Sequence, residues 1–377
     1  MKRKQRIAGY DLAKALSMIL VILLHLSFYT YEWPNNAAGD LLLAPDGICI
    51  PLFFAVNGAL LLPRPLNMKK HVHKLVVMVV IMELWKLLVA LFFVWASRPH
   101  PFTAKEFVGY MLGGTLGTNP TGHFWFINAL IAVYLVYPLI KRAYDSSYGS
   151  AFKWVTVVLG LFYIIVPSLA YLLNILTVMT NHDVSSLFSG IDDYNIFGKY
   201  GYTLFYFMVG GMFSNQSTKQ KLEHVKGRMG NRLIVPVAVV TLLVCFGLDY
   251  GINRFGRSVK GTQYEALGYP NGYLMLTTCI AALLVFALLL PVQVPHWSQR
   301  LVTILGSSTF GVYMLHVPIL VIIGKLQHHG FMMGNVLPGW LMPFWNVVLV
   351  LLIYVVCVFV SHWGAKIPVV GRLFTFK

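Results

Sequence analysis

Residues 10–27 read YDLAKALSMILVILLHLS, and this stretch decides the fold class. Its length is close to the roughly 20 apolar residues that a helix needs to cross a bilayer. Asp11, Lys14 and His25 are its charged or titratable exceptions. Similar apolar runs recur as far as residue 363. The 377-residue chain is 58% hydrophobic and 11% charged, against about 25% charged residues in an ordinary soluble domain. The sequence therefore predicts one integral-membrane domain over 1–377, with its core at about 10–363.

The apolar runs predict an all-helical bundle of about ten transmembrane helices. They are expected at 12–30, 47–62, 75–96, 124–140, 154–176, 201–213, 233–250, 272–290, 304–323 and 342–363. The glycine-rich residues 107–122 are expected to be re-entrant or interfacial. With the N-terminus in the cytoplasm, twenty of the 29 Lys and Arg residues fall on the cytoplasmic side. Both chain ends are therefore expected in the cytoplasm.

The formal net charge of +16 reflects the distribution of basic residues between the two membrane faces. Membrane lipids are expected as partners, and nucleic acid is not. The four cysteines lie scattered in or beside apolar runs without CxxC spacing, which gives little support to a disulfide framework or a metal site. The sequence also lacks the GxSxG, HExxH and Walker motifs of soluble enzymes. Any chemistry must come from groups embedded in the membrane.

Lys14 and His25 lie eleven residues apart in the first span. At about 100° per residue they return to one helix face, about 16 Å apart along the axis. An ionisable side chain inside a span is costly unless it faces the bundle interior or water, so this pair is a candidate functional site. The alternative is that Lys14 reaches the lipid phosphates and His25 is an interfacial residue with a local hydrogen bond.

Three other spans carry polar side chains. Glu83 and Lys86 are spaced i, i+3 and can neutralise each other, which favours a structural ion pair over a role in a substrate path. His123 directly precedes the fourth span, and an aromatic belt does not explain it. Tyr313 and His316 share a face of the ninth span with Thr309, which suits either a hydrogen-bond relay or a contact between helices.

Four stretches resemble the acyltransferase-3 family of bacterial membrane O-acyltransferases, in the family's order and spacing, over residues 10 to about 363. They are YDLAKALSMILVILLH (10–25), GICIPLFFAVNGALLL (47–62), HFWFINALIAVYLVYPLIK (123–141) and STFGVYMLHVPIL (308–320). The resemblance implies a multi-pass protein of a bacterial plasma membrane. It also implies acetyl-CoA from the cytoplasm as donor substrate, no bound cofactor, and a hydroxyl of an extracytoplasmic glycan as acceptor. The glycan would be a surface polysaccharide, peptidoglycan or a lipid-linked sugar, and partner proteins of a surface-polysaccharide pathway are possible.

The resemblance also assigns residues. His25 matches the family's essential His, and Lys14 stands where the family carries an Arg. Lysine keeps the charge but lacks the planar fork that grips phosphate or carboxylate in a bidentate manner. Asn57 stands where the family has a serine before glycine, and His71 and Lys74 match an Arg-x-x-Arg pair.

These assignments predict a site that connects the two membrane faces. Lys69, Lys70, His71 and Lys74 are expected to bind the anionic donor, although part of this cluster fits plain positive-inside charge. His25 is expected to act as general base on the acceptor hydroxyl or to relay the acyl group first, next to Lys14. The residues expected to support or line the site are Asp11, Asn57, Glu83, His123, Tyr313 and His316.

Two other functional classes remain open at this point. A glycan or lipid-linked sugar exporter would share this architecture, and a His25→Ala change that removes O-acetyl groups but leaves export intact would separate the two. A small-solute transporter would predict inverted repeats with paired broken helices, and the sequence shows none. A fused soluble racemase or esterase-like domain is not expected.

Overall fold

The computed structural model describes residues 7–26, 41–97, 103–112, 121–146, 149–182, 184, 197–258, 272–328, 338 and 340–375. Every regular element within these ranges is a helix. The main helices are α1 (Ala8–Leu26), α3 (Cys49–Leu61), α4 (Met68–Ser97), α5 (Ala104–Met111), α6 (Trp125–Asp145), α7 (Gly149–Gly160), α8 (Val166–Thr180), α9 (Gly201–Ser214), α10 (Gln216–Ser258), α12 (Leu276–Leu289), α13 (His296–Ser307), α14 (Thr309–His328) and α15 (Met342–Gly364).

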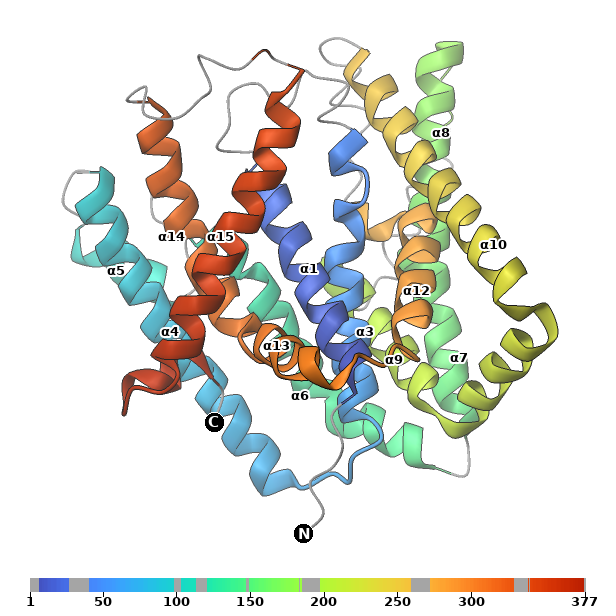
Figure 1. Cartoon of the computed structure of the whole chain (residues 1–377), viewed down its shortest axis with the longest axis horizontal. Coiled ribbons are helices and arrows are strands. Elements are labelled where there is room, and N and C mark those ends of the chain that lie inside the picture. Colours follow the sequence, from blue (N-terminus) through green and yellow to red (C-terminus); the bar gives the residue numbers. More distant parts are fainter. Residues whose placement is uncertain are drawn as a thin grey trace.

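Short helical turns precede or join several of these helices. They are η2 (Asp46–Ile48), η3 (Gly122–Phe124), the π-helical turn η4 (Leu161–Ile165) between α7 and α8, η7 (Gly198–Tyr200), η8 (Gly272–Leu274) and η10 (Val370–Phe374). Figure 1 shows that α1 begins and α15 ends at the same end of the bundle, which we call the N-terminal end. The other end is called the opposite end.

Eight segments in the described ranges are long and apolar enough to cross a membrane. They are Ala8–Leu26, Leu41–Leu61, Met68–Phe92, Gly122–Asp145, Gly149–Thr180, Arg232–Ile252, Thr309–Leu326 and Met342–Gly364. The predicted spans at 201–213 and 272–290 correspond to α9 and α12, which have 14 residues each. The structure therefore confirms a multi-pass helical membrane protein. A count of ten depends on whether these two short helices also cross.

Helix α1 occupies the middle of the bundle (Figure 1), where it packs against α3, α12, α13, α14 and α15. Twelve of its 19 residues are buried, so little of this helix faces the surroundings. This position follows from its sequence, because Ala13, Ala15 and Ser17 are small enough to let neighbouring helices approach. Asp11 and Ser17 are consequently buried, while Lys14 and His25 are partly buried.

Helices α3 and α9 pack tightly against each other, and two glycines make the approach possible. A Cβ atom on Gly58 would stand 1.7 Å from the carbonyl oxygen of Phe207, and one on Gly210 would stand 1.9 Å from that of Ala55. Small residues at such crossings bring backbones into van der Waals contact, which drives helix association in lipid. Helix α9 is almost entirely buried, so it is a core helix despite its short length.

The predicted span at 304–323 is wrong in one respect, because the structure divides it between α13 and α14 at Ser308. The side chain of Thr309 donates to the carbonyl of Gly306, and Ser361 donates to that of Ser308. The run Gly-Ser-Ser has low helix propensity, and side-chain hydrogen bonds of this kind compete with the helix ladder. Helix α13 runs crosswise at the N-terminal end, as Figure 1 shows.

The predicted segment 107–122 falls partly in α5, while residues 113–120 lie outside the described residues. Thr103 and Glu106 cap the start of α5 reciprocally. The backbone N–H and the hydroxyl of Thr103 donate to the carboxylate of Glu106, and these bonds lower the pKa of Glu106. Helix α5 packs against α4.

Candidate active site

Three histidines from three separate segments meet inside the bundle. His25 lies near the end of α1, His123 lies in η3 just before α6, and His316 lies in α14. The ring centroids are 5.0 Å apart for His25 and His316, 5.3 Å for His123 and His316, and 6.3 Å for His25 and His123. His316 is fully buried and His123 is 6% exposed. Tertiary packing therefore brings together three residues that the sequence predicts to belong to one functional site.

Backbone carbonyls fix the orientation and the tautomer of two of these rings. The Nδ1 atom of His25 lies 2.7 Å from the carbonyl oxygen of Val21, and Nδ1 of His316 lies 2.6 Å from that of Tyr313. A carbonyl oxygen can only accept a hydrogen bond, so each Nδ1 carries the hydrogen. The neutral ring then presents the basic lone pair on Nε2. Such a ring is prepared to take a proton or to attack a carbonyl carbon.

Tyr313 contributes to the same cluster from α14. Its hydroxyl donates to the carbonyl oxygen of His123 and so ties the turn before α6 to α14. In the part of the chain that the structure describes, the Nε2 atoms of His123 and His316 are buried and have no hydrogen-bond partner. Within the same residues, no group of three His, Cys, Asp or Glu side chains is arranged to hold a metal ion.

Lys14 marks the other end of the polar stripe on α1. Its ammonium group lies 2.7 Å from a carboxylate oxygen of Asp11 and donates to the carbonyl oxygen of Gly306 at 3.0 Å. Asp11 is 2% exposed, and a Cβ atom on Gly306 would stand 2.2 Å from its carboxylate. Gly306 lies in α13 and His316 lies in α14, which follows directly. The stripe on α1 therefore faces the α13–α14 unit.

A second polar network lies near the start of α4, towards the N-terminal end. Lys74 Nζ donates to the hydroxyl of Tyr134 at 3.3 Å, and that hydroxyl donates to Oδ1 of Asn57 at 3.3 Å. His71 Nε2 bonds the backbone carbonyl of Tyr134 at 2.9 Å, and the Lys74 ammonium also lies 4.8 Å from the centre of the Tyr134 ring. Arg64 is close enough to act electrostatically on Lys74. The network thus joins three predicted site residues from α3 and α4 to one tyrosine of α6.

The model of the acyltransferase-3 family, an acyltransferase domain, matches residues 7–363. The chain belongs to this family. No curated protein and no solved structure matches the chain significantly. The family match covers α1 to α15, including both the histidine cluster and the Tyr134 network, so the protein is a multi-pass membrane acyltransferase.

The acyltransferase-3 fold does not bring every predicted residue to these two networks. Lys69 and Lys70 lie exposed in the first turn of α4, and the backbone N–H of Lys70 is bonded to the side chain of Asn67. In the described residues, no hydrogen bond joins their ammonium groups to the Tyr134 network. They lie within four or five residues of Lys74, so they add positive charge near the network without taking part in it.

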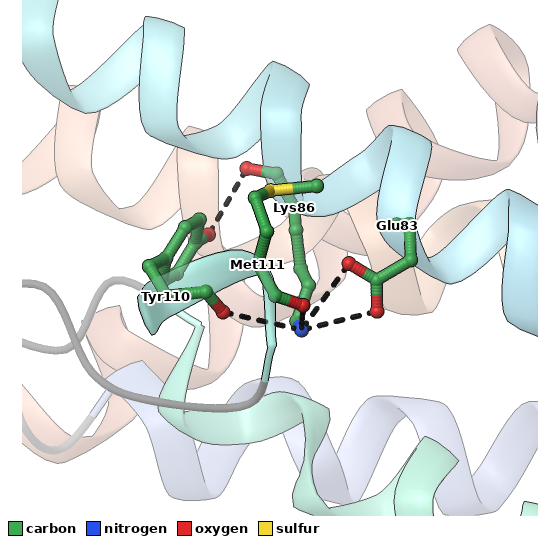
Figure 2. A network of polar contacts seen from close by, with 4 residues as sticks. All are labelled: Glu83, Lys86, Tyr110 and Met111. Carbon is green, nitrogen blue, oxygen red and sulfur yellow. Dashed lines mark hydrogen bonds and ion pairs between the residues drawn. The ribbon is translucent and has the colours of Figure 1, made fainter. Parts of the chain in front are cut away.

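Glu83 is placed away from the histidines. Figure 2 shows the Lys86 ammonium between the Glu83 carboxylate and the carbonyl oxygens of Tyr110 and Met111 at the end of α5. The hydroxyl of Tyr110 donates in turn to the carbonyl of Lys86. Lys86 is 6% exposed, and a cation at a helix C-terminus satisfies carbonyls that the helix itself leaves open. The pair therefore attaches α5 to α4. This fits the structural ion pair that the sequence favours over a role in a substrate path.

Sequence reasoning missed Tyr134. This residue lies in the apolar run AVYLVY of α6, where a tyrosine is unremarkable, and only its contacts with Asn57 and Lys74 distinguish it. The one signal in the sequence is that a tyrosine hydroxyl in the middle of a span needs a hydrogen-bond partner. That signal does not separate Tyr134 from Tyr137, which lies one turn later and bonds the carbonyl of Leu61.

Proposed function

We propose that this acyltransferase moves an acetyl group from cytoplasmic acetyl-CoA to a hydroxyl of an extracytoplasmic glycan in a bacterial plasma membrane. One observation carries the proposal. Lys14 and His25 both contact the α13–α14 unit, and the partly buried His25 meets the buried His123 and His316. An imidazole in such a cluster can accept a proton or an acyl group.

The donor would approach from the N-terminal end of the bundle, which the charge distribution assigns to the cytoplasm. Acetyl-CoA carries phosphate groups, and Lys74, His71 and Arg64 offer cationic or hydrogen-bonding side chains beside Tyr134. Lys69 and Lys70 increase the positive potential at the approach. Lys14, held by Asp11 and the Gly306 carbonyl, supplies a fixed cation between this entrance and His25.

The acceptor would approach from the opposite end, where η3 places His123 beside His25 and His316. The reaction needs a base for the acceptor hydroxyl and a path for the acyl group between the two faces. The histidine cluster is the one group in the described residues that offers several imidazoles at contact distance. Its position near the end of α1 fits transfer to an external alcohol.

The test uses the purified protein in liposomes with labelled acetyl-CoA and a panel of surface glycans. Wild type is expected to transfer label to one of these glycans, and His25→Ala is expected to abolish transfer. The matched control is His362→Ala, because His362 lies at the far end of α15 and contacts Trp363. Unchanged transfer in His25→Ala would remove His25 from the reaction. An exporter would instead be favoured if wild type transfers no label in liposomes and cells that carry His25→Ala lose the exported glycan itself.

A further inference from the structure

The Nε2 atom of His316 has no hydrogen-bond partner within the described residues, although the side chain is fully buried. Its Nδ1 is committed to the carbonyl of Tyr313, so Nε2 of the neutral ring can only accept. A buried acceptor that is left unpaired is destabilising, because it has lost its hydrogen bonds to water. Native proteins satisfy nearly all such groups, and an exception calls for an explanation. A ligand that donates a hydrogen bond would explain this one.

The neighbouring side chains do not supply that donor. Tyr313 gives its hydroxyl hydrogen to the carbonyl of His123, and His25 gives its Nδ1 hydrogen to the carbonyl of Val21. A molecule that reaches Nε2 of His316 must therefore bring its own donor. The ring centroids of His25 and His316 are 5.0 Å apart, and the two planes meet at 73°. An alcohol carries the required hydrogen, and after deprotonation it becomes a nucleophile.

We propose that His316 is the general base that takes the proton of the acceptor hydroxyl, while His25 carries the acetyl group. The inference rests on the proposed function and divides its chemistry between two residues. A single imidazole whose Nε2 is acylated has no lone pair left for a proton. Two adjacent imidazoles, each with Nδ1 bonded to a backbone carbonyl, can perform the two tasks at the same time.

The reaction then proceeds in two balanced steps. In the first, Nε2 of His25 attacks the thioester carbonyl carbon, the carbon–sulfur bond breaks, and the thiolate of CoA leaves and takes a proton from water. In the second, the acceptor oxygen attacks the acetyl carbon as its proton moves to Nε2 of His316. The bond between carbon and Nε2 of His25 breaks, and its electron pair returns to the ring. His316 finally releases its proton to water, which restores both imidazoles.

The decisive variant is His316→Gln, assayed as the full-length protein in liposomes with labelled acetyl-CoA and the glycan that wild type acetylates. Glutamine keeps an acceptor oxygen for the hydroxyl but cannot hold the proton. Transfer to the glycan is expected to fall by about 100-fold or more, the typical contribution of a general base. Labelled acetyl is expected to accumulate on the protein, at His25 by peptide mass spectrometry. His25→Gln should show neither product, and His362→Gln should behave as wild type.

A second variant distinguishes the loss of a base from misfolding of the protein. His316→Ala removes the ring, and free imidazole added to the assay is expected to restore part of the transfer because the base can be supplied from outside. Wild-type transfer in His316→Gln would overturn the proposal. Loss of transfer without protein-bound label, and without rescue by imidazole, would also overturn it and leave His316 a packing residue. If wild type itself transfers no label from acetyl-CoA, the proposed function falls, and this inference falls with it.

Discussion

Lys14 is held by a carboxylate and a carbonyl, and this shows how one cation is kept inside a membrane protein. Asp11 neutralises its charge, while the Gly306 carbonyl takes a second ammonium hydrogen. The pair is local in sequence, at i, i+3, so α1 brings its own counter-ion. Lys14 therefore finds a carboxylate partner one turn earlier on its own helix.

Replacing Lys14 by Met removes the ammonium group that lies 2.7 Å from the buried Asp11 carboxylate. We expect Lys14→Met to destabilise the protein by about 3 kcal/mol, because one partner of a buried pair is removed. Asp11→Asn added to Lys14→Met should restore part of that loss, since it removes the buried charge that Lys14 contacts. Thermal unfolding midpoints in detergent measure both effects. Equal midpoints for the single and double variants would contradict this account of the pair.

Tyr134 is a positioning residue, because its hydroxyl orients Lys74 against Asn57. We expect Tyr134→Phe to raise the KM for acetyl-CoA by about tenfold, as the loss of one hydrogen bond to a charged group implies, with a smaller change in kcat. Tyr144→Phe is the matched control on the same helix, since its hydroxyl bonds the carbonyl of Gly211 instead. A fall in kcat with an unchanged KM would place Tyr134 outside donor binding.

At the scale of single elements, the break between α13 and α14 lets two consecutive helices contact the two polar residues of α1. These residues are Lys14 and His25. Helix α13 presents the Gly306 carbonyl to Lys14, and α14 presents His316 to His25. A straight helix over 304–323 would change the angle between these two contacts. The Gly-Ser-Ser sequence and the bonds from Thr309 and Ser361 hold the break in place.

Gly306→Ala tests this arrangement. The added Cβ atom would stand 2.2 Å from the Asp11 carboxylate, so α13 must move away from α1. We expect acetyl transfer to fall by about 100-fold, the scale of loss that a displacement near 1 Å causes in a positioned site. Gly251→Ala is the control, because a Cβ atom there meets no other group within 4 Å. Activity close to wild type in Gly306→Ala would show that the contact is dispensable.

At the scale of the whole molecule, the two polar networks lie towards different ends of the bundle. The Tyr134 network lies near the start of α4, and the histidine cluster lies near the end of α1. An acyltransferase whose substrates come from opposite faces needs this separation, together with a link between the two ends. In this chain the central helix α1 spans the distance.

The orientation of the bundle can be tested by thiol labelling on intact cells. All four native cysteines are buried, so the background from the protein should be low. We expect a membrane-impermeant maleimide to label Lys105→Cys, on α5 at the opposite end, and to leave Lys69→Cys, at the start of α4, unlabelled. Both positions should react once the membrane is permeabilised. The reverse pattern would invert the topology and move the donor site outside the cell.

The sequence by itself determined the membrane class, the helical architecture and the placement of most spans, because hydrocarbon imposes a length and an apolar composition that a single helix must satisfy on its own. It also indicated the common face of Lys14 and His25, because a helix repeats every 3.6 residues. Tertiary structure alone decided that His123 and His316 meet His25, that Tyr134 joins Asn57 to Lys74, and that Lys86 bonds the carbonyl oxygens at the end of α5. These are contacts between distant segments. They depend on how the helices pack and cross, and that geometry comes from side-chain fit at places such as Gly58 and Gly306, which local periodicity does not encode.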